Sequence, residues 1–364
     1  MKKLLILAAM AGVALVSCVK NEPAPSVTDQ HEITFAPPVT SVNTKANTYG
    51  QLTDLTDYPT TENFSVYAVW HSEAFSGWAS SGTTLYMDKV ETAYNSSLNG
   101  WDPAQVTGGK EYYWPKNGYL TFAAFSPSNV NATNVQYDAT GLKLTGFQVA
   151  ANSSQQIDVL FSQRSYDKQK SSTTNTNTKY DEVDIDFEHA LSSIQFKAKI
   201  AEAYDGTTIT LKKISVYGVY SKGDFNETID ETTPSTYKST PTWNNHDAGS
   251  VIAEANAYEY YNSSTGQVLT TSEWTMNGVT DQTDLILLPQ TLPETATIVV
   301  EYTIKSPTAT SAIDIVLEKK IKDITTEWKA DYRYTYHISV ALDEIYFAPE
   351  VMAWTESDSH TVGI

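Results

Sequence analysis

The stretch Ile194-Gln195-Phe196-Lys197-Ala198-Lys199-Ile200 decides the fold class of this chain. Apolar residues occupy every second position, and polar or charged residues fill the positions between them. Because a β-strand points successive side chains to opposite faces, this alternation predicts a strand with one buried and one solvated face. The same period recurs elsewhere, at residues 209–217, 298–304, 313–317 and 334–342.

Two longer apolar segments, Phe64–Trp70 and Tyr119–Phe125, predict strands that are buried on at least one face. A shorter alternation at Ile33 and Phe35 predicts one more strand, ahead of a Pro-Pro pair. Stretches rich in Gly, Ser, Asn and Thr separate these segments and indicate loops. No stretch has the period of an amphipathic helix longer than a few turns. An all-β fold of antiparallel β-sandwiches is therefore expected.

A polar run at residues 163–182 cannot bury much apolar surface and is interpreted as the region between two domains. The length of 364 residues also suggests two domains. We therefore expect an N-terminal β-sandwich domain over residues 33–182 and a C-terminal one over residues 183–364. Residues 221–284 are polar and irregular, which predicts a long loop excursion with room for one hairpin.

The N-terminus has the layout of a secretory signal. Lys2 and Lys3 precede an uncharged apolar stretch at residues 4–16, which is shorter than the ~20 residues of a membrane-spanning helix. The stretch ends in Leu15-Val16-Ser17-Cys18, which resembles the lipobox of exported bacterial lipoproteins. We expect residues 1–17 to be a lipoprotein signal peptide, Cys18 to be lipidated, and residues 18–32 to form a flexible tether.

An ordinary signal peptide with a chance cysteine is the alternative interpretation. Cys18 is the only cysteine of the chain and stands at the position that a lipobox requires, which favours lipidation. Lipidation consumes the thiol, so catalysis by cysteine, zinc–cysteine sites and disulfides are all excluded.

The chemistry-bearing motifs of common enzymes are missing from the sequence. There is no Gly-x-Ser-x-Gly, no phosphate-binding Gly-rich loop and no His-Glu-x-x-His. The formal net charge of -19 excludes nucleic acid as a partner, because phosphates are repelled. A glycosidase carboxylate pair stays open as an alternative, since 43 Asp and Glu residues hide any such pair. Neither catalysis nor a cofactor is expected.

Two groups of polar residues need a local interpretation. His337 lies in an alternating strand, which favours a solvated histidine at the rim over a metal ligand. Asp181, Asp184 and Asp186 resemble a calcium loop, but apolar residues interleave with them and the Gly of an EF-hand turn is missing. A strand with a wet acidic face is the better interpretation, and no metal site is expected.

Six phrases, in this order along the chain, resemble the fimbrillin family, whose members build type V pili from secreted lipoprotein precursors. The phrases are Tyr113-Trp114-Pro115 with Leu120–Pro127, Asp158–Phe161, Phe187–Ile194, Leu287–Leu292, Trp328-Lys329-Ala330 with Tyr334-Thr335-Tyr336, and Ile345–Trp354. Core packing is expected of Trp114, Phe122 and Phe125. His189 is expected to be a buried, hydrogen-bonded structural residue.

The resemblance implies two tandem transthyretin-like sandwiches that assemble by strand exchange. Residues 33–45 would be a removable strand, cut between Lys45 and Ala46. The family usually has Thr-Arg here, so Lys45 departs from its pattern, and a solvated surface lysine is the alternative. The donor strand would come from residues 345–364, whose apolar residues are Ile345, Phe347, Val351, Trp354, Val362 and Ile364.

The function expected from this resemblance is that of a structural subunit of a surface pilus that supports cell adhesion. Its partners would be other pilus subunits, a processing protease and, in the precursor, the outer membrane through the lipid anchor. The chain stops soon after Trp354, which favours a shaft subunit over a tip or anchor subunit. The alternative is an outer-membrane surface lipoprotein that binds glycans through exposed aromatic residues in polar loops, Trp78, Trp101 and Trp243.

Overall fold

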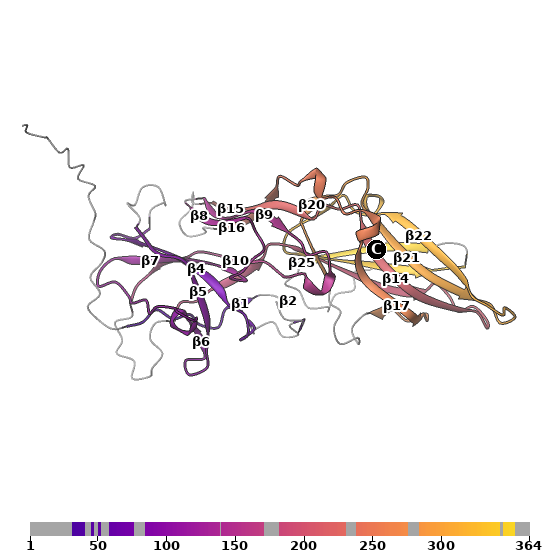
Figure 1. Ribbon diagram of the computed structural model, residues 1–364, viewed down its shortest axis with the longest axis horizontal. Coiled ribbons are helices and arrows are strands. Elements are labelled where there is room, and N and C mark those ends of the chain that lie inside the picture. The colour runs from indigo at the N-terminus through magenta and orange to yellow at the C-terminus, as the bar shows by residue number, and fades with distance from the viewer. Residues whose placement is uncertain are drawn as a thin grey trace, which may run out of the picture.

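The computed structural model describes residues 31–40, 45–46, 50–51, 58–75, 84–138, 140–170, 182–230, 238–275, 284–342 and 345–353. These residues form β-strands and short 3-10 helices, without an α-helix among them. No helix in this part of the chain has the length and apolarity needed to cross a membrane. The molecule is elongated, with the early strands at one end and β14, β17, β21 and β22 at the other (Figure 1). The expected all-β fold is confirmed.

The first region of the molecule contains an eight-stranded sheet. Its order is β1-β12-β10-β7-β4-β5-β6, and β11 also pairs with β7. The strands are β1 (Val39–Thr40), β4 (Phe64–His71), β5 (Thr84–Asn95), β6 (Gly100–Asp102), β7 (Tyr119–Ser126), β10 (Leu160–Ser162), β11 (Ser165–Lys168) and β12 (Asp186–His189). Alternate side chains enter two hydrophobic cores, so Phe122 packs in one and Phe125 in the other. Trp114, Phe122 and Phe125 are buried, as expected.

A second sheet covers the face of the first that carries Phe125. Its order is β16-β15-β9-β8, formed by β8 (Asn134–Asp138), β9 (Gly141–Gln148), β15 (Lys222–Asp230) and β16 (Lys238–Asn244). The hairpin β15–β16 comes from the segment predicted to be a loop, and Figure 1 shows it beside β8 and β9. Glu227, at a buried position of β15, accepts hydrogen bonds from the Leu142 N–H (2.7 Å) and the Ser239 hydroxyl.

The second region is a sandwich of two further sheets. One has the order β18-β13-β24-β25 with β19 on β13, and the other has the order β17-β14-β21-β22. The strands of the first are β13 (Ser192–Ile200), β18 (Trp274–Thr275), β19 (Leu285–Leu287), β24 (Tyr332–Val340) and β25 (Ile345–Ala353). Those of the second are β14 (Thr208–Tyr217), β17 (Tyr258–Val268), β21 (Thr297–Lys305) and β22 (Ile313–Lys320). A small sheet joins β20 (Gln290–Thr291) to β23 (Glu327–Trp328).

All five alternating segments of the sequence form strands, namely β13, β14, β21, β22 and β24. Two details differ from the expectation. β13 and β24 run parallel, as do β1 and β12, so the sheets are not purely antiparallel. The segment 221–284 contains β15, β16, β17 and β18, so its interpretation as a loop excursion is wrong, although its hairpin is confirmed.

The chain does not leave the first region at the end of the polar run. β10 precedes the run, β12 follows it, and the two strands pair with each other. Val183, Ile185 and Phe187 are buried in the first region's core, while Asp184 and Asp186 are exposed. The alternation of buried apolar and exposed acidic side chains is thus confirmed, but the strand itself begins only at Asp186, and Val183 forms an isolated bridge before it. Asp181 lies outside the described residues. The domain limits drawn from the sequence stay a prediction.

Candidate functional site

Residues 31–40, here called the closing segment, extend along the edge of the eight-stranded sheet next to β6. Phe35 and Trp101 exchange backbone hydrogen bonds, with N···O distances of 2.9 and 2.8 Å. Further bonds run from the Ile33 N–H to the Tyr112 carbonyl and from the Trp114 N–H to the His31 carbonyl, at 2.7 and 3.0 Å. One side of the closing segment is therefore held from His31 to Phe35 by the chain between residues 101 and 114.

The other side of the closing segment pairs with the chain that leads into β12. The Val183 N–H donates to the Thr34 carbonyl (2.9 Å), and the Ala36 N–H donates to the Val183 carbonyl (3.1 Å). β1 continues this pairing in parallel, with Val39 opposite Asp186 and Thr40 opposite Phe187. Since β6 and β12 lie at opposite ends of the sheet order, the closing segment fills the gap between them and closes the sheet.

The side chains of the closing segment contribute to the core of the first region. Ile33 and Phe35 are 1% and 0% exposed. The Phe35 ring meets Phe64 and Phe122 edge-on, with centroids 5.8 and 5.9 Å apart. Gly100 permits the close approach of the backbones, because a Cβ there would lie 2.6 Å from the Phe35 carbonyl oxygen.

The predicted processing site follows the closing segment directly. Lys45 and Ala46 form β2, which pairs only with β3 (Gly50–Gln51) among the described strands. β1 ends at Thr40, so a cut after Lys45 would leave the closing segment as a peptide held by non-covalent contacts alone. Cleavage at this bond stays a prediction.

The predicted donor strand lies partly within β25. This strand pairs with β24 from Val340↔Ile345 to Tyr332↔Ala353 and is the last strand of its sheet. Val351 is 48% exposed, whereas Phe347 is partly buried against the core. The rest of the predicted set, and the lipidation site, lie outside the described residues: Trp354, Val362, Ile364 and Cys18.

His189 is fully buried at the junction of the two regions, as expected of a structural residue. Its Nδ1 lies 2.5 Å from Oδ2 of Asp158, and both side chains are 1% exposed. Asp331, in the turn before β24, interacts electrostatically with the same histidine. Burial raises the pKa of Asp331 to about 6, and the charges of Glu188 and Asp158 add to this effect.

His337 is partly exposed and lies between two carboxylates. Its Nδ1 is 2.7 Å from Glu273 and its Nε2 is 3.2 Å from Glu350, which agrees with a histidine at the rim. Among the described residues, no group of three or more His, Cys, Asp or Glu side chains could hold a metal ion.

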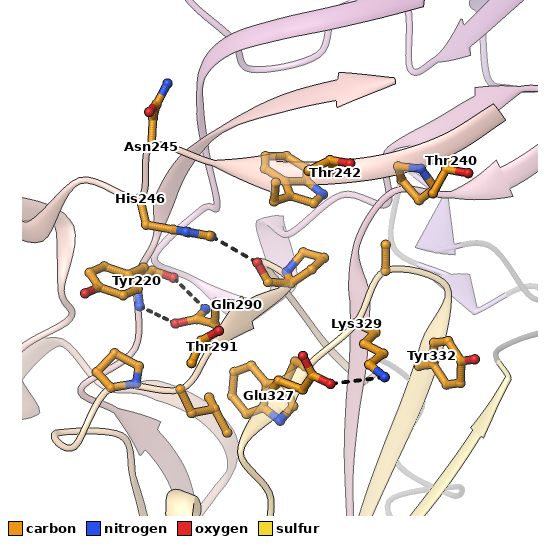
Figure 2. Close-up of a pocket in the computed structure, with 17 residues that line it drawn as sticks. Tyr220, Thr240, Thr242, Asn245, His246, Gln290, Thr291, Glu327, Lys329 and Tyr332 are labelled. Carbon is orange, nitrogen blue, oxygen red and sulfur yellow. Dashed lines mark hydrogen bonds and ion pairs between the residues drawn. The ribbon is translucent and has the colours of Figure 1, made fainter. Parts of the chain in front are cut away.

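A cleft with a volume of about 980 Å³ separates β16 from the segment around β23, and we call it the β16 cleft. Figure 2 shows Thr240 and Thr242 on one side of it and Glu327, Lys329 and Tyr332 on the other. Tyr220 and His246 lie at one end, and Pro289–Pro293 form part of the lining. The lining residues come from segments far apart in the sequence, which is why no local pattern predicted the cleft.

The three tryptophans considered for glycan binding have different environments. Trp101 is 1% exposed, so its interpretation as an exposed loop residue is wrong. Its indole N–H donates to the Glu62 carbonyl, and its ring packs against Tyr58 and Tyr94. Trp243 is partly exposed and lines the β16 cleft. Trp78 lies outside the described residues.

Comparison with known proteins identifies the family of this chain. A family model described as fimbrillin-like matches residues 44–354. No curated protein matches the chain.

Among solved structures, a fimbrial protein from Bacteroides vulgatus is 13% identical, with a TM-score of 0.52 over 88% of this chain and 99% of that protein. A putative cell adhesion protein from Bacteroides ovatus is 13% identical, with a TM-score of 0.48 over 92% of this chain and 100% of that one. The first likeness supports the fold, and the family match extends over most of the chain. The chain belongs to the fimbrillin-like family.

Proposed function

We propose that this protein is a structural, non-catalytic subunit of a surface pilus, assembled by strand exchange after proteolysis. One observation carries the proposal: the closing segment is hydrogen-bonded on both sides and completes a sheet that is open without it. Membership of the fimbrillin-like family supports the role in a fibre.

The closing segment is suited to act as a placeholder. Removing it would expose the backbone groups of Trp101 and Val183 and the site of the Phe35 ring. Burying the side chains of Ile33 and Phe35 is worth roughly 1.5–3 kcal/mol each, so the opened groove would strongly favour a replacement strand. A strand from a neighbouring subunit can satisfy the same backbone groups by β-augmentation.

The donor in this proposal is the C-terminal segment, residues 345–364. Its first part, β25, is an edge strand held by β24 alone among the described strands. An edge strand has a free row of backbone groups and fewer contacts to break than a central strand. Ile345, Phe347, Val351, Trp354, Val362 and Ile364 supply apolar side chains for the groove.

The proposal extends to export and anchoring. Cys18 accepts the lipid, the precursor is an outer-membrane lipoprotein, and the processed form enters surface fimbriae that support cell adhesion. A protease that accepts lysine cuts between Lys45 and Ala46 and so frees the subunit from its anchor.

Controlled proteolysis tests the proposal. Purified precursor is treated with a lysine-specific protease, and polymers are followed by size-exclusion chromatography and electron microscopy. The wild-type protein is expected to show Ala46 as an early new N-terminus and then to polymerise. The Lys45→Gln variant is expected to stay monomeric. Its other lysines should be cut as fast as those of the wild type, which shows that only the cut at residue 45 is lost.

A peptide competition isolates the groove itself. An excess of a synthetic peptide with the sequence of residues 31–40 is expected to occupy the opened groove and to block polymerisation. The same peptide with Phe35→Asp should not block it, because a carboxylate in the aromatic site is costly to bury. Polymers that form equally fast with both peptides would refute strand exchange at this groove.

A further inference from the structure

The β16 cleft combines fixed aromatic rings with exposed hydrogen-bonding groups. Trp243 is held in place by its indole N–H, which donates to the Ala190 carbonyl at 2.5 Å. Its ring also packs against Phe147 and Phe225, each with a centroid distance of 5.4 Å. A partly exposed ring that is fixed in this way loses little conformational entropy when a ligand binds against it.

A second pair of rings lies at one end of the cleft. Tyr220 and His246 pack with their centroids 5.3 Å apart, and His246 Nε2 lies 3.0 Å from the Pro289 carbonyl oxygen. Gln290 holds the Tyr220 backbone from both sides: its Oε1 accepts from the Tyr220 N–H, and its Nε2 donates to the Tyr220 carbonyl. Figure 2 shows these contacts, with Tyr332 at the opposite end of the cleft.

The polar groups of the cleft are numerous, but its two charged side chains are paired. Thr242 and Thr291 are exposed residues of its lining and can exchange hydrogen bonds with hydroxyl groups, whereas the Asn245 amide already donates to Asp224 at 2.9 Å. Lys329 and Glu327 neutralise each other across 3.0 Å. Among the described residues that line the cleft, no carboxylate or ammonium group is therefore left unpaired to select a charged ligand.

The β16 edge of the cleft is unsuited to an added peptide strand. In β16, the backbone N–H and carbonyl of Ser239 point away from β15. The N–H donates to Gln163 Oε1, and the carbonyl accepts from Gln163 Nε2. The backbone nitrogen of Pro241, two residues further along the strand, also faces away from β15, and it carries no N–H that a peptide could bond to. A peptide therefore cannot form a continuous ladder along this edge.

From these features we propose that the β16 cleft binds a neutral oligosaccharide. Sugar rings present apolar C–H faces that pack on aromatic side chains, and hydroxyl groups that bond to threonine, amide and carboxylate groups. The volume of about 980 Å³ lies within the range of small-ligand sites and accommodates more than one sugar unit. None of the residues that line the cleft belongs to the closing segment or to β25, although the Tyr332 backbone pairs with Ala353 of β25. The test therefore uses the unprocessed protein, in which β25 is in place.

A glycan array with the unprocessed protein tests this inference. The probes are immobilised neutral oligosaccharides that end in glucose, galactose, mannose, N-acetylglucosamine or fucose, together with sialylated and sulfated forms and a proline-rich peptide. Binding to at least one neutral oligosaccharide is expected, with its affinity then measured by calorimetry. Binding confined to charged glycans or to the peptide, or to none of the probes, would overturn the proposal.

Matched variants place the binding in the cleft. Tyr332→Ala and Thr242→Ala are each expected to weaken binding about tenfold, while Tyr332→Phe retains the ring and most of the affinity. Tyr346→Ala is the control, because Tyr346 is also an exposed tyrosine (52%, against 38% for Tyr332) but lies outside the β16 cleft. Thermal melting of each variant checks the fold. Unchanged affinity in both cleft variants would exclude this cleft as the site.

Discussion

Phe35 and Trp101 form a reciprocal pair, in which the N–H of each residue donates to the carbonyl of the other, at 2.9 and 2.8 Å. The pair joins the closing segment to β6, and the Phe35 ring reaches past it to Phe64 and Phe122. Gly100 lies beside the pair and leaves room for the Phe35 carbonyl. Closure of the sheet thus depends on glycine at position 100, because a side chain there would collide with the Phe35 carbonyl oxygen.

The Gly100→Ala variant is expected to loosen the closing segment. Its Cβ would lie 2.6 Å from the Phe35 carbonyl oxygen, so the backbone must shift and the two hydrogen bonds of the pair weaken. Loss of both bonds costs about 2 kcal/mol of unfolding free energy. Hydrogen exchange at the Phe35 and Trp101 amides should accelerate, and the melting temperature should fall.

Gly249→Ala is the control for this change, because the nearest atom to its Cβ belongs to the exposed Asp247 side chain. Equal effects of the two substitutions would contradict a specific role of Gly100 in closure.

The Val351→Asp variant is expected to fold as a monomer but to polymerise poorly after cleavage at Lys45. Val351 is 48% exposed, so the substitution should change the stability of the monomer by at most about 0.5 kcal/mol. In a neighbour's groove, the same carboxylate would be buried without a partner. Val316→Asp, at a 62% exposed position of the edge strand β22, is the matched control. Light scattering measures how much polymer each variant forms, and a thermal melting curve shows whether each variant is folded. Together the two measurements distinguish Val351→Asp from Val316→Asp.

Deletion of Thr355–Ile364 removes the end of the predicted donor strand and keeps its first part, β25. Soluble, cooperatively melting monomers that no longer polymerise are expected, and replacing Val362 and Ile364 with Asp should have the same effect. A truncated protein that cannot fold would mean that the tail completes its own subunit. Fibres formed at the wild-type rate would confine the donor to β25 or place it elsewhere.

The Asp331→Asn variant is expected to change how stability depends on pH. Burial raises the pKa of Asp331 from 3.8 to about 6, so the folded state keeps a proton that the unfolded state has lost. Stability from this group is therefore fully present below pH 4 and falls as the pH rises to about 6, by about 2 kcal/mol after allowance for partial exposure. Asn also tolerates the left-handed backbone of this position (φ 63°).

Thermal melting from pH 4 to pH 7 measures this effect. Asp331→Asn should be more stable than wild type at pH 7 and should lack the decline between pH 4 and 6. Asp323→Asn, at an exposed carboxylate, serves as the control. Parallel curves for wild type and Asp331→Asn would show that this carboxyl does not contribute to the decline.

The Cys18→Ala variant is expected to lose lipid attachment. Without the acceptor thiol the precursor should remain uncleaved in the inner membrane or appear soluble in the periplasm. Metabolic labelling with a fatty acid and membrane fractionation give the result, with the outer-membrane fraction of wild type as reference. Acyl labelling that persists in the variant would rule out Cys18 as the attachment site.

The sequence predicted the strands whose buried face is apolar, because a period of two is visible wherever one face is wet. β13 directs Ile194, Phe196 and Ala198 inward as the pattern predicted, but its other face is only partly wet, because Gln195 is buried and accepts a hydrogen bond from Thr335. β15 was not predicted, because Glu227, a hydrogen-bonded carboxylate, occupies a buried position of that strand and interrupts the apolar pattern.

Which strands pair with each other could not be predicted from the sequence, for a different reason. Val183, Ile185 and Phe187 correctly indicated a strand, but nothing in their local pattern says that β12 pairs back with β10 and with the closing segment. The β16 cleft has the same character, since Tyr220, Trp243 and Tyr332 line one cleft only after the sheets that contain β16 and β24 have formed. Contacts of this kind depend on topology and not on local periodicity.

The return of hairpin β15–β16 to the first region has a mechanical consequence. Along the described strands, the chain crosses between the two regions three times, after β12, after β14 and after β16. One hydrophobic cluster also continues across the junction, from Phe161 and Phe225 to Ile194 and Tyr336. A single linker would let the regions pivot, whereas three connections around a shared core resist both hinge motion and torsion. Each subunit should therefore transmit tension as a stiff rod, and a fibre built from such rods would take up its curvature at the joints between them.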